Sequence, residues 1–505
     1  MKKLHLTLLA ALLFGVVPLA ASAAGWTPSD PLMPTGDSTL DTENLQAALL
    51  DSRLDTGGTL YLGPGTFMIH RFIGRQDISD PSDPSYSIDL FNGTIQGAGK
   101  GVTILRGVRG PGGVSFEPLH YELPGFASDD HTLLGLVQVY LGVKDLTFDS
   151  EATLVDPNNA NGNRGLINYL GTGSFEISLN ELIGTDVTNV HFKGSLDSAG
   201  DPETSHLFQQ WGDEGGVHNI TNSEFENSSN GALQFFDLAN ATINIGGSPN
   251  DSVTIINAFL GGVQFGGCRN CTVNVSHLKT HDSAGVYFWP GWSNTYSTIT
   301  VTHSEIRTKP DSSYAGIELW GRSGDISVLI EKNKIHNEDS FLWGPIFSDG
   351  AIQSGLIANN KITGRGPAAM YLEIDSWREG SVAIVGNNLN GWVTTADPWW
   401  LGTKPIWLGP FVVDSLVVGG YNHMNVFDEP AYDTSWNPLY DENGNPLTIP
   451  GYGDLIPPEE FGNLVPKNNT FTGVNNMHSN IGQDVREAMR QKVEVKQSLM
   501  SELHR

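Results

Sequence analysis

The sequence predicts an all-β solenoid of stacked coils, with a short helix capping its start and a helical tail at its end. The first observation is a repeat of five apolar strand residues, spaced 28, 29, 27 and 27 residues apart at Leu278, Ile306, Ile335, Ile362 and Leu389. The second is a polar residue two positions before each, at Ser276, Ser304, Asn333, Asn360 and Asn387. Units of this length, joined by Gly, Asn and Ser turns, bury their apolar faces only by stacking.

A second short strand follows the first in each repeat, at 285–289, 316–320, 345–349 and 369–373. One elongated domain accounts for most of the 505 residues, because the core of a solenoid grows by adding coils. The 59 glycines, 27 prolines and only 17% charged residues are typical of a turn-rich β protein. We expect residues 71–427 to form the coils, with loop insertions between 111 and 214.

Residues 1–23 have the pattern of a secretory signal peptide. Lys2 and Lys3 precede an apolar run from Leu6 to Leu19, and Ala21-Ser22-Ala23 provides small residues for cleavage. The sequence therefore predicts a secreted or periplasmic protein of bacterial type. No later stretch is apolar enough to span a membrane.

The chain is strongly acidic. Its formal net charge is −28, and −30 without residues 1–23, which hold two lysines and no acidic residue. Such a surface repels nucleic acid and anionic membranes, and it opposes binding of a polyuronate unless Ca²⁺ or local cations offset it. Neutral glycans meet no such barrier, so a polysaccharide or oligosaccharide is the expected partner.

The first part of the mature chain, residues 24–70, is expected to cap the solenoid. Leu45, Ala48 and Leu49 share one helical face, with Asp41 or Thr42 as the N-cap. Two strands then flank a Gly-Pro-Gly turn in the stretch 57–69. The order is helix, strand, turn and first coils.

These residues carry a resemblance to a known family. The short helix, the run Gly-Gly-Thr-Leu-Tyr-Leu-Gly-Pro-Gly-Thr-Phe from Gly57 to Phe67, and Ile-Gln-Gly-Ala-Gly from Ile95 to Gly99 resemble the start of the pectate-lyase-like superfamily. The resemblance covers roughly residues 37–427 and implies a right-handed parallel β-helix. It implies less about the reaction, since that superfamily contains lyases, hydrolases, epimerases and proteins that are not enzymes.

Two segments follow the coils. Residues 428–474 form a Pro-rich extension in which the stretch 439–447 predicts an Asn-Gly hairpin. Residues 475–505 predict an amphipathic helix, whose apolar residues fall mostly on one face. That tail either caps the last coil, which we favour, or mediates oligomerisation.

The only two cysteines, Cys268 and Cys271, stand in a Cys-x-x-Cys arrangement. A structural zinc site would need two further ligands, and a redox motif would need a helix start. We expect either a local disulfide or two inert thiols inside the core.

The second strands place candidate binding residues on one outer face. If Leu233, Val263, Val286, Ile317, Ile346, Met370 and Ile406 point inward, alternation turns the residues one and three positions later outward. The outward residues then include Gln234, Gln264, Tyr287, Trp289, Trp320, Phe347, Tyr371 and Trp407. Exposed aromatic surface of this extent marks an interaction site, and sugar rings pack on indole and phenol groups. The alternative is that a loop or the tail covers these rings as a second core.

Carboxylates on the same face indicate catalysis. Asp349 and Glu373 occupy one column in consecutive coils, about 4.8 Å apart along the backbone, near the ~5–5.5 Å separation of a retaining glycosidase pair. Glu318 is the other candidate, at a longer, inverting-type distance. Two carboxylates this close raise one pKa or bind a cation. Arg322 and Asp375 share a further column and are expected to orient these groups or to contact substrate.

The sequence thus favours a secreted polysaccharide-active enzyme, a glycoside hydrolase more than a lyase. A lyase would use Tyr287, His281 or Arg322 as base. It would also need Arg378 or a Ca²⁺ ion held by Asp349 and Glu373 to neutralise the uronate; no other cofactor is indicated. The motifs typical of pectate lyases, polygalacturonases and alginate epimerases are missing. The alternatives are a carbohydrate-binding or surface β-helix protein without catalysis, and a purely structural solenoid.

Overall fold

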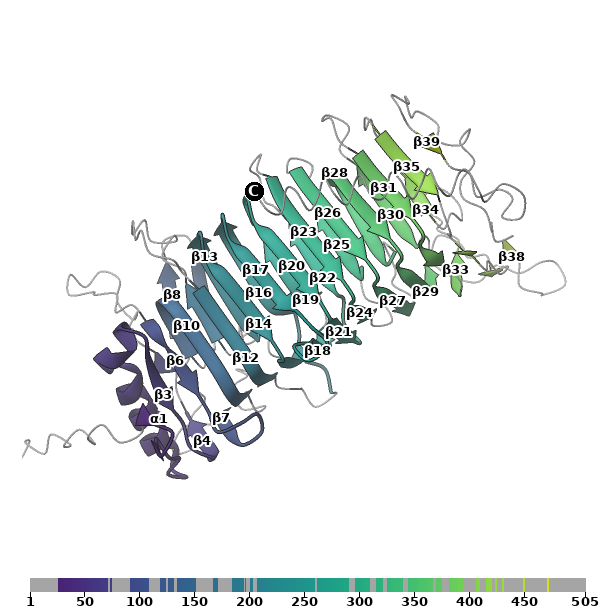
Figure 1. The fold of residues 1–505 in the computed structure, drawn as a ribbon. Helices are drawn as coiled ribbons and strands as arrows, with labels where there is room; N and C mark the ends of the chain where they lie inside the picture. Colours follow the sequence, from purple (N-terminus) through teal and green to yellow (C-terminus); the bar gives the residue numbers. More distant parts are fainter. Residues whose placement is uncertain are drawn as a thin grey trace, which may run out of the picture.

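The computed structural model is an elongated stack of parallel coils (Figure 1). It describes residues 26–70, 73–74, 91–108, 119–123, 126–130, 134–150, 167–170, 184–194, 196, 200–202, 207–258, 261–289, 296–308, 315–320, 325–338, 344–366, 369–374, 381–389, 391–394, 406–408, 415–419, 423–424, 429–430, 448–449 and 470–471. Each coil contributes strands to three parallel sheets, which we call sheet 1, sheet 2 and sheet 3 in chain order. The predicted parallel β-helix is confirmed.

Three long strands turn from one sheet into the next. They are β10 (Leu134–Asp149), which runs through all three sheets, β12 (Gly184–Lys193) and β28 (Ile346–Ala358). Sheet 1 is completed by β3 (Gly58–Tyr61), β6 (Phe91–Gln96), β14 (Val217–Thr221), β17 (Thr242–Gly246), β20 (Thr272–Ser276), β23 (Tyr296–Thr302), β26 (Asp325–Glu331), β31 (Ser381–Val385), β35 (Ser415–Gly419) and β39 (Thr470–Phe471).

The other two sheets follow the same order. Sheet 2 is completed by β4 (Gly65–Ile69), β7 (Thr103–Gly107), β15 (Glu224–Ser228), β18 (Val253–Ala258), β21 (Leu278–His281), β24 (Glu305–Arg307), β27 (Lys334–Glu338), β29 (Lys361–Gly366), β32 (Asn388–Leu389), β33 (Trp392–Thr394) and β36 (His423–Met424). Sheet 3 is completed by β5 (Ile73–Gly74), β11 (Ile167–Leu170), β13 (Phe208–Glu214), β16 (Gly231–Ala239), β19 (Gly261–Gly266), β22 (Val286–Trp289), β25 (Ile317–Trp320), β30 (Met370–Ile374) and β34 (Ile406–Leu408).

Three short antiparallel pairs lie outside these sheets. They are β1 (Trp26–Thr27) with β2 (Asp30–Pro31), β8 (Leu119–Leu123) with β9 (Phe126–Asp130), and β37 (Glu429–Pro430) with β38 (Thr448–Ile449). The predicted signal peptide, the 439–447 hairpin and the 475–505 tail lie outside the described residues.

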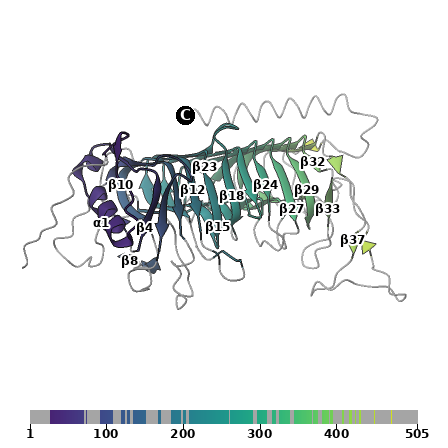
Figure 2. The same ribbon diagram turned by 90° about the horizontal axis from the view of Figure 1, so that it is seen from below.

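Helix α1 (Ser38–Leu49) covers the first coils at one end of the stack (Figures 1 and 2). It buries Leu45 and Leu49, as predicted, and a 3₁₀ turn (Ser52–Asp55) follows it. The predicted N-cap was wrong. Asp37 caps the helix by accepting hydrogen bonds from the amides of Thr39 and Leu40, whereas the buried Asp41 accepts from Thr35 and from the amide of Met68 in β4. Helix α1 is too short to cross a membrane, and the described chain holds no other α-helix.

The enclosed core is a set of side-chain ladders. Phe148, Phe192 and Phe225 stack in sheet 2 with ring centroids 5.1 and 4.7 Å apart. Phe235 and Phe265 stack in the same way in sheet 3, at 5.6 Å. Each such pair adds about 0.5–1.5 kcal/mol beyond the burial of its area. The ladders fix the register between coils, because a shift of one residue would turn every ring outward.

The corner between sheet 1 and sheet 2 uses one residue with positive φ per coil. Nine consecutive coils place there Asp145, Asn189, Asn222, Gly246, His277, His303, Lys332, Asn359 and Gly386, with φ between 47° and 76°. Asn and Asp tolerate this conformation better than most residues. At Gly246 the requirement is also steric, because a Cβ would lie 1.8 Å from the carbonyl oxygen of Ser276.

The predicted polar column is confirmed for four of its five members. The amides of Ser304, Asn333 and Asn360 donate in turn to the side-chain oxygens of Asn333, Asn360 and Asn387. Ser276 and Leu278 were assigned two residues out of register. Ile306 pairs with Thr280, so that coil is 26 residues long, and Leu278 itself donates its amide hydrogen to Ser304 Oγ.

The two cysteines both face the core. Cys268 and Cys271 are buried thiols, and Cys271 Sγ donates to the carbonyls of Leu238 and Arg269 at 3.5 Å. Of the two expectations, buried thiols rather than a disulfide is the one observed.

Candidate functional site

The predicted register of sheet 3 is confirmed along its length. The residues Leu233, Val263, Val286, Ile317, Ile346, Met370 and Ile406 lie opposite one another from strand to strand. The next residues therefore form a continuous column on the outer face: Gln234, Gln264, Tyr287, Glu318, Phe347, Tyr371 and Trp407. We call this outer side of β16 to β34 the sheet 3 face.

The sheet 3 face divides into an accessible part and a buried part. Gln234, Gln264, Tyr287, Trp289 and Trp320 are half-buried and reach solvent. The expectation that the aromatic residues are exposed along the whole column was wrong: Phe347 and Tyr371 are only 2% and 8% exposed. They pack with Ala315 and Trp320 in a small apolar cluster outside the sheet, as the alternative of a second core had it.

The accessible part begins with an amide pair. Gln264 lies between Gln234 and Asn230, with its amide nitrogen 3.2 Å from Asn230 Oδ1. Beyond it, the ring of Phe236 lies over Gly266, where a Cβ would stand 2.5 Å from the ring, and it reaches the indole of Trp289 at a centroid distance of 6.4 Å. Amide groups and an aromatic surface are thus side by side across β16, β19 and β22.

Trp320 borders both parts of the face. Its indole tilts against Phe347 with a centroid distance of 5.1 Å, and Phe347 stacks on Tyr371 at 5.3 Å. Its indole N–H donates to Glu318. The indole is therefore fixed on one side while part of it remains open to solvent.

Glu318 is the described carboxylate with the strongest perturbation. Its side chain is 2% exposed, between Tyr287 and Phe347 in register. Burial raises the pKa of Glu318 to about 7, although the amide of Ala315, at 2.9 Å from Oε2, and the indole of Trp320 both favour its charged form. A carboxyl that titrates near neutral pH can donate or accept a proton.

The other predicted site residues are placed only by their backbone or not at all. Asp349 in β28 lies opposite Trp320 on one side and opposite Glu373 of β30 on the other, so the predicted neighbourhood of the two acidic residues is confirmed in register. Trp407 in β34 lies opposite Tyr371. Arg322 and Asp375 lie outside the described residues.

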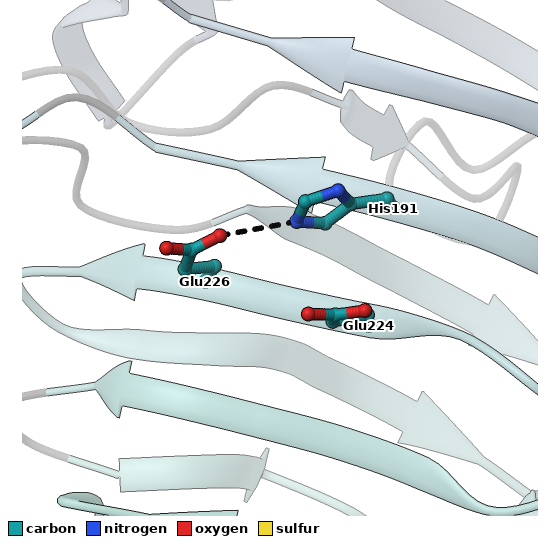
Figure 3. Close-up of side chains that lie close together, drawn as sticks. All are labelled: His191, Glu224 and Glu226. Atoms are coloured by element: carbon teal, nitrogen blue, oxygen red, sulfur yellow. Dashed lines mark hydrogen bonds and ion pairs between the residues drawn. The ribbon is translucent and has the colours of Figure 1, made fainter. Parts of the chain in front are cut away.

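Sequence reasoning missed a second group of polar side chains. His191 of β12 and Glu224 and Glu226 of β15 gather on the outer face of sheet 2 (Figure 3). The alternation Glu-Phe-Glu around the inward Phe225 was visible in the sequence. Its alignment with His191 was not, because the coil between them contains long insertions.

Comparisons with known proteins return two solved structures. One is a mannuronan C-5 epimerase A-module from Azotobacter vinelandii, with 14% identity, a TM-score of 0.30, and coverage of 75% of this chain and 94% of that one. The other is the catalytic unit of a GH87 α-1,3-glucanase from Streptomyces thermodiastaticus, with 12% identity, a TM-score of 0.35, and coverage of 79% and 70%. No family model matches the chain, and no curated protein does. The site is therefore argued from its own geometry.

Proposed function

We propose that the protein acts on a polysaccharide that it binds along the accessible part of the sheet 3 face. Tyr287, Trp289 and Trp320 offer aromatic surface to the apolar side of sugar rings. Gln234 and Gln264 offer amide donors and acceptors for sugar hydroxyls. The residues come from consecutive strands about 4.8 Å apart, so the face suits an extended chain of sugars.

The reaction we propose is glycoside hydrolysis after export of the protein. The observation that carries it is Glu318, whose pKa of about 7 suits a general acid, within the column of Tyr287 and beside Trp320. Asp349 or Glu373 would serve as the second carboxylate. Elimination is less favoured, because a uronate substrate would meet a chain with a net charge of −28 unless Ca²⁺ were bound.

A second candidate is glycan binding without catalysis. It is favoured by the 2% exposure of Glu318 and by the two N–H groups that donate to its carboxylate. In that function Glu318 holds the backbone at Ala315 and the indole of Trp320 in place for a sugar, and the aromatic surface alone supplies affinity.

The experiment is incubation of the purified protein with a panel of neutral and uronate polysaccharides, with and without Ca²⁺. Reducing ends and the ultraviolet absorbance of unsaturated uronate products are followed together. Hydrolysis yields reducing ends without absorbance, and elimination yields both. Glu318→Gln, Asp349→Asn and Glu373→Gln are then tested for turnover and, by affinity electrophoresis, for binding.

Trp320→Ala tests the binding face. We expect it to weaken glycan binding roughly tenfold or more, equivalent to about 1.4 kcal/mol or more, because a partly accessible indole surface is lost. Tyr61→Ala, which removes a half-buried ring from sheet 1, is the matched control and should bind as the wild type does. Loss of turnover with binding retained in Glu318→Gln supports hydrolysis. Binding without turnover in the wild type selects the second candidate, and unchanged binding in Trp320→Ala refutes both.

A further inference from the structure

Three side chains with metal-binding atoms converge on the outer face of sheet 2, away from the sheet 3 face. His191, Glu224 and Glu226 each offer one ligand atom, and these atoms lie within 4.8 Å of one another (Figure 3). His191 Nε2 is 3.3 Å from Glu226 Oε2. Side-chain exposure is 21% for His191 and 32% for each glutamate, so the group is anchored in the surface and still open to water.

The backbone and the core hold this group in position. His191 lies directly opposite Glu224 in the parallel ladder between β12 and β15, and Glu226 follows two residues later on the same face. The intervening residues point inward, where the ring of Phe192 stacks on that of Phe225. The three side chains therefore start from fixed points on two consecutive coils.

The donor set suits a divalent transition-metal ion. In zinc sites the metal lies about 2.0–2.2 Å from nitrogen and oxygen ligands, which places neighbouring ligand atoms of a tetrahedral site about 3.3 Å apart. His191 and Glu226 already have this separation. Imidazole nitrogen favours Zn²⁺ and its neighbours in the transition series, whereas Ca²⁺ and Mg²⁺ prefer sites made only of oxygen.

Nearby lysines set the charge of the group. With a neutral imidazole the two carboxylates carry two negative charges, and Lys100 Nζ lies 3.6 Å from Glu224 Oε2. Lys193, opposite Glu226 in register, is exposed. Lys100 thus offsets one of the two charges, and it competes with a cation for Glu224.

A similar pair in sheet 2 shows which feature matters. His336 Nε2 lies 3.7 Å from Glu338 Oε1 within β27, but Arg307 donates two hydrogen bonds to that same oxygen. Among the described residues, only the group at His191 brings three ligand-type side chains together. His336 is therefore the matched control for His191.

We propose that His191, Glu224 and Glu226 bind one divalent transition-metal ion, with Zn²⁺ as the probe, which links two consecutive coils and leaves its remaining coordination positions to water. This site is independent of the proposed glycan face.

The test is Zn²⁺ titration of the purified full chain by calorimetry, with thermal unfolding of each variant to show that it folds. We expect one site whose affinity falls tenfold or more in His191→Asn and in Glu226→Gln, and is unchanged in His336→Asn. Lys100→Met should bind Zn²⁺ more tightly than the wild type. Zn²⁺ should also raise the melting temperature of the wild type but not that of His191→Asn.

Three results would overturn the proposal. One is a wild type that binds no Zn²⁺, and another is a His191→Asn variant that binds it with wild-type affinity. The third is an equal loss in His191→Asn and His336→Asn, which would mean that scattered surface histidines bind the metal. Titration with Ca²⁺ is expected to give weaker binding than Zn²⁺, and the reverse order would also contradict the site.

Discussion

The carboxyl group of Glu318 links the stability of the protein to pH. Its pKa is about 7 in the folded chain against an ordinary value of 4.5. Between these values the unfolded chain has released this proton while the folded chain retains it, so stability falls as pH rises from about 4.5 to 7. The shift corresponds to at most about 3 kcal/mol.

Glu318→Gln removes this titration. We expect the stability of the wild type relative to Glu318→Gln to be greatest near pH 4.5 and to decline steadily up to pH 7. Urea unfolding of both proteins across this range measures the difference and cancels the other carboxyl groups. A difference that stays constant with pH would mean that the pKa of Glu318 is not raised.

At the scale of the strand and its neighbours, the buried amide column holds successive coils together. Asn360 is fully buried, accepts from the amide of Asn333, and donates through Nδ2 to the carbonyl of Ile330 and to Asn387. Asn360→Ala leaves several of these groups without their partner. We expect a loss of roughly 2–4 kcal/mol in the free energy of unfolding, since each unsatisfied buried group costs about 1–3 kcal/mol.

The matched control is Asn250→Ala, at an exposed position, which should change stability by less than about 0.5 kcal/mol. Urea unfolding measures both variants. Equal midpoints for Asn360→Ala and the wild type would show that the column does not contribute to stability.

Sheet 3 was predictable from the sequence because alternation alone decides which residues face the core. From Leu233 to Ile406 the assignment agrees with the structure in every strand. The corner at Leu278 was misassigned because a coil of 26 residues has the same apolar pattern when shifted by two. Alternation also cannot predict what lies above a face, so the burial of Phe347 and Tyr371 was missed.

For the whole molecule, the net charge of −28 opposes compaction. The Debye length falls from about 30 Å at 0.01 M salt to about 8 Å at 0.15 M, so salt screens repulsion between charges spread along the stack. We expect the melting temperature at pH 7 to rise by several degrees over this range of NaCl. The effect should vanish near pH 4.7, the isoelectric point, and a melting temperature independent of NaCl at pH 7 would contradict the expectation.

The parallel ladders also determine how the molecule would respond to mechanical force. Hydrogen bonds between coils point along the long axis, so a pull on the two ends loads one ladder after another instead of shearing a whole sheet. The coil between β23 and β26 holds 29 residues, which release roughly 100 Å of chain when fully extended. Stretching would therefore lengthen the protein in steps, one coil at a time.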